Sequence, residues 1–219
     1  MKGVWWKLGS SLLVIYALTA GLLLEVPRLV VLNETIRNLY YHVGMWFSML
    51  ALWTVSLYFS IKQLRTPSVE IDRKAESAAA VGLFLGILGL LTGMLWAQFT
   101  WGRFWTNDPK LNGTAISLLA YLAYFVLRSS LDDPSKRGRI AAVYNVFAFV
   151  IMIVFIQVLP RLTDSLHPGN GGNPAFGTYD LDNAMRLVFY PAMIGWIGWG
   201  YWLFDLHHRF QSIKYQRNK

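Results

Sequence analysis

The sequence predicts an all-α integral membrane protein, a bundle of six transmembrane helices with an outward-facing tryptophan-rich loop. Three observations lead to this fold class. Of the 219 residues, 55% are hydrophobic and only 15% are charged, and long uncharged apolar runs recur along the chain. This combination is typical of a chain embedded in a lipid bilayer. We expect one polytopic membrane domain over residues 1–219.

Each span is predicted from an apolar run, because a membrane helix needs about 20 mostly apolar residues. The runs lie near residues 5–25, 41–61, 78–99, 112–128, 140–160 and 185–206. The first resembles a signal peptide, but its apolar stretch exceeds the usual core of about 7–15 residues and five spans follow, so we expect a retained helix. The fourth is the shortest. Asp108 and Pro109 precede it, and an aspartate cap followed by proline is a helix-start signal.

The distribution of positive charge predicts the orientation. With six spans both termini lie on one side, and that side carries fourteen of the twenty Lys and Arg residues. The positive-inside rule then places both termini in the cytoplasm. Three loops face outward, at residues 26–40, 100–111 and 161–184.

Two classes of chemistry are excluded by composition. The chain contains no cysteine, so it forms no disulfide, thiolate metal site or thioether link to a cofactor. Its formal net charge is +8, but the basic residues are spread over short segments that flank apolar runs. Charge in this arrangement sets orientation in the lipid membrane, and we expect no nucleic acid among the partners.

The segment WAQFTWGRFWTNDPKL, residues 96–111, places Trp96, Trp101 and Trp105 at the outer membrane edge. Tryptophans gather there in aromatic belts, which is the simplest interpretation of a single ring. The spacing favours more: Trp101 and Trp105 are four residues apart, so a short helix would place both rings on one face. Such a shelf would hold a large planar apolar ligand by stacking.

The four histidines narrow the choice of ligand, since imidazole is the commonest metal ligand in proteins. His42 begins the second span at its outer end, and His167 lies in the third outer loop, at the same membrane face as the tryptophans. Two imidazoles beside a ring-lined surface fit a haem with two axial histidines. His207 and His208 lie at the cytoplasmic end of the last span, where we expect interface anchors.

The motif WxxxxWGxFWxxDPKL, followed by LLAYLAYFVLR, resembles the tryptophan-rich WWD signature of cytochrome c maturation proteins. The YYHV and SLHPG contexts of the two outer histidines are similar to those of the same superfamily. Six spans, this length and a single signature most resemble the CcmC (haem exporter protein C) family, over essentially the whole chain. Two positions depart from the pattern: Phe104 stands where a tryptophan is usual, and Asn107 replaces the tryptophan before the aspartate.

The resemblance implies haem handling and transfer rather than catalysis on a metabolite. It implies that haem b is held transiently and non-covalently and is presented to a haem chaperone for cytochrome c biogenesis. Further partners would be the ABC-transporter subunits and a small single-span subunit of the same system. The site residues carried over are the two metal-ligating histidines and four positions in the signature: His42, His167, Trp96, Trp101, Trp105 and Asp108.

Two other functions remain open at this stage. A bis-histidine electron-transfer cytochrome would use the same ligands, but its histidines are expected at matching depths inside spans. A transporter for another substrate is the second alternative, although few charged residues lie deep in the predicted spans. Arg128, near the cytoplasmic end of the fourth span, is expected to extend toward the interface as an anchor.

Overall fold

The computed structural model describes residues 3–169, 175–177 and 180–217, and six of its helices are long and apolar enough to cross a membrane. They are α1 (Val4–Leu23), α2 (Leu39–Arg65), α3 (Val69–Trp101), α4 (Pro109–Ser129), the rod that begins with α5 (Pro134–Met152), and α7 (Asn183–Arg217). The described residues contain no strand. The predicted all-α bundle of six transmembrane helices is therefore confirmed.

Five of the six spans run further than the apolar stretches that predicted them, whereas α1 ends at Leu23, before the predicted end at residue 25. The rod of α5 continues through a π-helical segment, η2 (Ile153–Val158), into α6 (Leu159–Leu162). Pro160 lies just beyond η2. A proline has no backbone N–H and so removes one hydrogen bond of the helix, and a wider π-helical turn accommodates that loss. α2, α3 and α7 extend into charged turns at one end, because helices continue past the apolar core of a membrane span.

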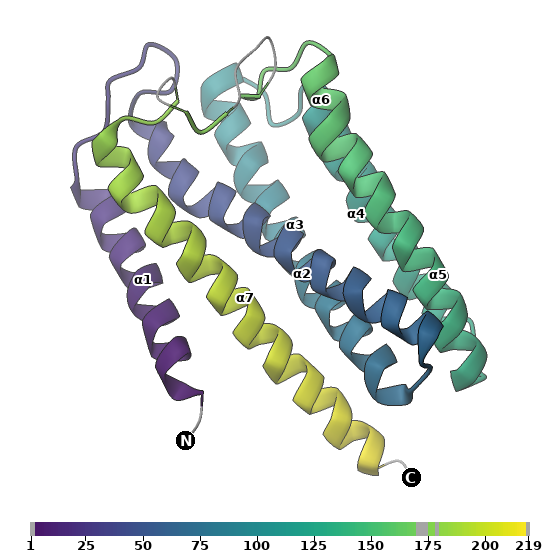
Figure 1. Cartoon of the computed structure of the whole chain (residues 1–219). Helices are drawn as coiled ribbons and strands as arrows, with labels where there is room; N and C mark the ends of the chain where they lie inside the picture. The colour runs from purple at the N-terminus through teal and green to yellow at the C-terminus, as the bar shows by residue number, and fades with distance from the viewer. Residues whose placement is uncertain (1–2, 170–174, 178–179, 218–219) are drawn as a thin grey trace.

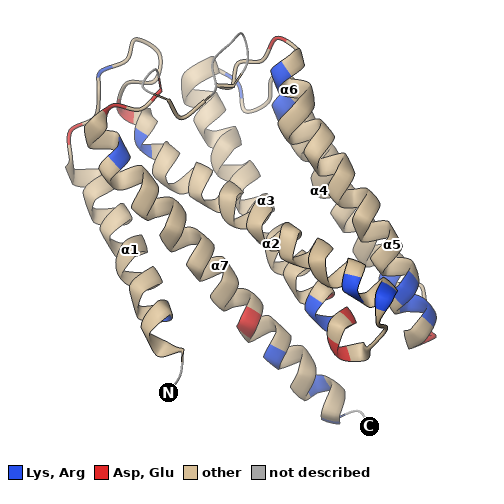
Figure 2. Cartoon of the chain, in the orientation of Figure 1, with Lys and Arg blue, Asp and Glu red and all other residues tan. Residues whose placement is uncertain are grey.

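Both termini lie at the same end of the bundle, which we call the termini end (Figure 1). The opposite end, called the loop end, carries the 3₁₀ helix η1 (Asn33–Asn38) and the connection of residues 102–108. Lys and Arg residues concentrate at the termini end (Figure 2). α2 packs against α3, α5 and α7, whereas α1 packs chiefly against α7.

The interior of the bundle is partly polar, and its outer surface is apolar. Ser56, Ser60 and Asn145 are fully buried, and the Asn145 Nδ2 donates to both serine hydroxyls at 2.7 Å. Nearby, the rings of Trp53 and Tyr121 stack with centroids 3.7 Å apart. Large apolar side chains such as Leu12, Leu91 and Phe147 are exposed instead. Buried polar side chains and exposed apolar ones are what a helix bundle surrounded by lipid requires.

Candidate functional site

The candidate site lies at the loop end, where α2, α3 and α4 meet the segment that follows α6. His42 is in the first turn of α2, and its Nδ1 lies 2.9 Å from the carbonyl oxygen of Gly89 and 3.2 Å from the hydroxyl of Thr92, both on α3. A carbonyl oxygen can only accept, so the hydrogen of the neutral ring is on Nδ1. The Nε2 lone pair of His42 is then available to a metal.

Tryptophan rings enclose His42 on two sides. The Trp46 and Trp96 rings approach it edge to face, with centroids 6.0 and 5.9 Å away. The Trp96 indole donates to Thr35 Oγ1 at 3.1 Å, so it is held to η1. Gly93 on α3 lies directly against the His42 ring. A Cβ added there would lie 2.6 Å from His42 Cε1, so only glycine allows α3 to approach this ring.

Asp108 fixes the second histidine. It is almost fully buried, and its Oδ1 lies 2.9 Å from the His167 Nδ1. The other carboxylate oxygen accepts from the Ser165 hydroxyl at 2.8 Å and from the Leu166 backbone N–H at 2.7 Å. The segment that carries His167 is therefore attached to the start of α4. An ionised carboxylate only accepts, so His167 also donates from Nδ1 and leaves Nε2 for a metal.

The same carboxylate caps α4. Asp108 Oδ1 accepts from the backbone N–H groups of Lys110 and Leu111, with Pro109 in the first turn. The helix start predicted from the Asp-Pro step is confirmed, and the aspartate serves both the helix and the histidine.

The hydrogen bonds to Asp108 keep it ionised. Burial raises the pKa of its carboxyl, but the bonds from His167, Leu166 and Ser165 lower it more, so this pKa lies well below its usual range. A depressed folded-state pKa means that the stability from Asp108 is fully present above the ordinary carboxyl pKa of about 3.9. That stability is lost only as pH falls through the lower folded value.

The end of α3 connects the two histidine environments. Trp101, the last residue of α3, approaches His167 edge to face with centroids 5.1 Å apart, while Trp96 lies one and a half turns earlier beside His42. Of the six residues predicted for the site, the two histidines thus have three of the others in contact with them: Trp96 beside His42, and Trp101 and Asp108 beside His167.

Trp105 does not share a helical face with Trp101, so that part of the prediction is wrong. α3 ends at Trp101 because Gly102 adopts a left-handed conformation, with φ of 74°. The chain then turns away, Trp105 is exposed, and its indole donates to Asn112 Oδ1 at 3.3 Å. The Trp105 ring therefore lies against the start of α4 instead of beside a histidine.

Asn107, one of the two departures from the family signature, takes part in the same contact. Its Oδ1 accepts from Asn112 Nδ2 at 2.7 Å. Sequence reasoning missed four residues that shape the site: Trp46, Gly89, Thr92 and Gly93. Among these, only the Thr92-Gly93 pair, which interrupts an apolar run in the predicted third span, is a signal visible in the sequence.

A family model described as heme exporter protein C, CcmC, matches residues 2–217. The chain belongs to the heme exporter protein C family. The six apolar helices and this membership make it a multi-pass membrane protein. The resemblance inferred from the tryptophan-rich signature and the two histidines is confirmed at the level of the family.

Individual relatives of this CcmC-family chain share shorter stretches. The heme exporter protein C of Bradyrhizobium diazoefficiens is 36% identical over 112 residues, 51% of this chain and 42% of the relative. That of Rhodobacter capsulatus is 25% identical over 138 residues, 63% of this chain and 57% of the relative. The cytochrome c biogenesis protein CcsA of Prochlorococcus marinus subsp. pastoris is 37% identical over 91 residues, 42% of this chain and 28% of the relative. The chain thus spans about half the length of the heme exporter relatives.

The structure predicts that Trp101 contributes more to haem retention than Trp105 does. We expect Trp101→Ala to lower haem retention several-fold, because it removes the ring beside His167. Trp105→Ala should have a much smaller effect, because that ring is exposed and contacts Asn112. Haem content per protein after purification in detergent measures both, with membrane yield as the control for folding. Equal losses in the two variants would contradict the assignment.

Proposed function

We propose that this protein binds haem between His42 and His167 at the loop end and presents it to a haem chaperone in cytochrome c biogenesis. One observation carries the proposal: each imidazole donates its Nδ1–H to a protein oxygen and lies beside a tryptophan ring. Oriented in this way, both Nε2 atoms are free to bind iron as axial ligands. Family membership and the names of the relatives support a role in haem handling.

The haem carboxylates need cationic partners, and we propose Lys110 for this role over Arg37 and Arg161. Arg37 is already paired with Glu34 and donates to the Gly21 carbonyl oxygen, and the Arg161 Nε donates to the Gln157 carbonyl oxygen. Lys110 is in the first turn of α4, two residues after the aspartate that holds His167. A lysine there would bind a propionate as a point charge.

The location that we propose is the periplasmic face of the bacterial inner membrane. Figure 2 shows Lys and Arg concentrated at the termini end, and positive charge favours the cytoplasmic side. The loop end would then face the periplasm, where the chaperone could collect the haem. The ABC-transporter subunits and the single-span subunit of the maturation system are the further partners that we propose.

The test is the absorption spectrum of the purified protein with and without the chaperone. Wild type should carry non-covalent haem b with a bis-histidine spectrum, and haem-free chaperone should remove it. His42→Ala and His167→Ala should each lose most of that band, because each leaves the iron with one protein ligand.

His207→Ala is the matched control, since His207 is on α7 at the termini end and should leave the spectrum unchanged. Wild-type protein without haem, under conditions that load the chaperone, would contradict haem binding. Haem that stays bound while electrons exchange and the chaperone remains empty would favour the electron-transfer cytochrome instead.

A further inference from the structure

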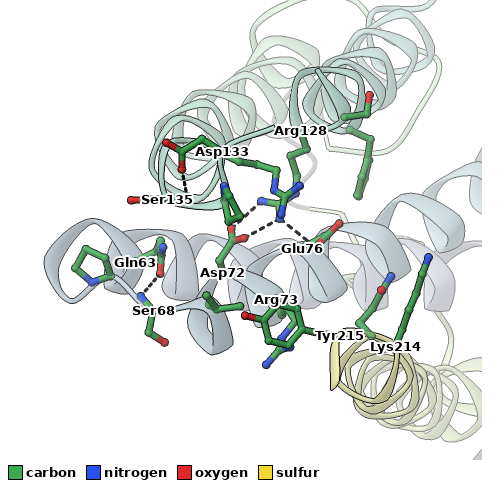
Figure 3. Close-up of a pocket in the computed structure, with 17 residues that line it drawn as sticks. Gln63, Ser68, Asp72, Arg73, Glu76, Arg128, Asp133, Ser135, Lys214 and Tyr215 are labelled. Atoms are coloured by element: carbon green, nitrogen blue, oxygen red, sulfur yellow. Dashed lines mark hydrogen bonds and ion pairs between the residues drawn. The ribbon is translucent and has the colours of Figure 1, made fainter. Parts of the chain in front are cut away.

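A cavity of about 900 Å³ lies at the termini end, opposite the candidate haem site. It is bounded by the turn between α2 and α3, the turn between α4 and α5, and the last turns of α7 (Figure 3). The starts of α3 and α5 both line it, at Ser68 and Asp133. These two helix starts are capped by the protein itself, by the Ser68 hydroxyl at α3 and the Asp133 carboxylate at α5.

The acidic groups of the cavity have hydrogen-bond donors within the protein. Arg128 binds both carboxylate oxygens of Asp72, at 2.7 and 2.8 Å, and Glu76 at 3.0 Å. Asp133 accepts from the backbone N–H groups at the start of α5. The lining carries three acids, Asp72, Glu76 and Asp133, and four cations, Arg73, Arg128, Arg137 and Lys214, so its formal net charge is positive.

Three cations from three different helices remain: Arg73 of α3, Arg137 of α5 and Lys214 of α7. Arg73 pairs with Glu70 through one nitrogen, and its guanidinium lies over the Tyr215 ring. Among the described residues, the Nε and Nη1 of Arg73 and the Nε of Arg137 have no hydrogen-bond partner. In the part of the chain that the structure describes, neither Arg137 nor Lys214 forms a salt bridge.

From these groups we infer a binding site for a phosphate group, carried by a membrane phospholipid or by a soluble phosphate. A phosphate offers several acceptor oxygens, which match three cations that line one cavity from separate helices. Basic cavities between membrane helices near the cytoplasmic surface bind anionic headgroups for the same reason. Val69, Phe125 and Pro134 give the remaining wall an apolar surface for the rest of a lipid. The site is independent of the proposed haem function.

Native mass spectrometry of the full chain in detergent tests the inference, with dioleoyl phosphatidylglycerol as one probe and sodium phosphate as the other. Wild type should bind one probe molecule. Arg137→Gln/Lys214→Gln should weaken that binding at least tenfold. The matched control is Lys136→Gln/Arg217→Gln, which removes the same charge from the same two helices at positions that do not line the cavity, and it should bind like wild type.

The two probes identify the source of the phosphate. Lipid binding that millimolar phosphate does not displace assigns the site to a phospholipid, whereas phosphate binding with the same dependence on Arg137 and Lys214 assigns it to a soluble ligand. Equal losses in both double variants, or no binding of either probe, would overturn the inference. Lys214→Gln alone changes an exposed side chain, so it provides the test should the double variant fold poorly.

Discussion

Replacing Asp108 with asparagine should lower haem affinity by roughly 10- to 100-fold, the usual cost of losing a carboxylate that orients a metal-binding histidine. The Asp108 carboxylate accepts from the imidazole of His167, from the Ser165 hydroxyl and from the Leu166 N–H. An amide offers one acceptor oxygen in place of two and turns a donor toward groups that also donate. His167 would lose both its fixed orientation and the negative charge beside it.

Asparagine separates this effect from simple loss of the helix start, because asparagine caps helices about as well as aspartate. α4 should therefore remain formed in Asp108→Asn, while Asp108→Ala should lose both the cap and the histidine contact. Haem titration followed by absorption gives the affinity. The midpoint potential of bound haem should also rise, since the carboxylate stabilises the ferric state through its histidine.

The chain contains a matched control at its other end. Asp133 caps α5 in the same way, accepts from the backbone of Ser135 and Lys136, and precedes Pro134 just as Asp108 precedes Pro109. Asp133→Asn should leave both haem affinity and potential unchanged. An Asp108→Asn variant with wild-type affinity and potential would show that Asp108 only caps α4.

Features of the site that depend on neighbouring residues in the sequence could be predicted, whereas contacts between distant residues could not. The Asp-Pro step at 108–109 is a local signal, and apolar runs identify spans without any tertiary information, so both were predicted correctly. The acceptor of His42 is Gly89, 47 residues later, and a backbone carbonyl has no sequence signal. Trp105 was misplaced because the termination of α3 depends on Gly102 in a left-handed conformation, which competes with the four-residue spacing of the tryptophans.

The sequence-based expectation for Arg128 is also wrong, for a related physical reason. An arginine near the end of a predicted span was expected to extend to the interface, yet its side chain is only 6% exposed and binds two acids on α3. Those acids lie 56 and 52 residues earlier, at Asp72 and Glu76. Both acids precede the predicted span of residues 78–99, and only the extension of α3 beyond its apolar stretch brings them opposite α4.

Replacing Arg128 with methionine should therefore lower the free energy of unfolding by about 3–5 kcal/mol, the typical cost of removing one partner of a buried ion pair. The change leaves the buried Asp72 carboxylate and the half-buried Glu76 without their cation. Unfolding of the purified protein in mixed detergent and dodecyl sulfate, followed by tryptophan fluorescence, measures the loss. Arg139→Met on α5 is the control, since Arg139 is exposed and should change the unfolding free energy little.

A second variant shows whether the loss comes from the unpaired acids. Arg128→Met/Asp72→Asn/Glu76→Gln removes the whole buried charge cluster, and replacing all members of such a cluster is often neutral or stabilising. Most of the lost stability should return. No recovery in the triple variant would mean that Arg128 acts through its packing against Tyr124 rather than through charge. Because the ion pairs lie at the termini end and both histidines at the loop end, the folded fraction of Arg128→Met should still bind haem with wild-type affinity.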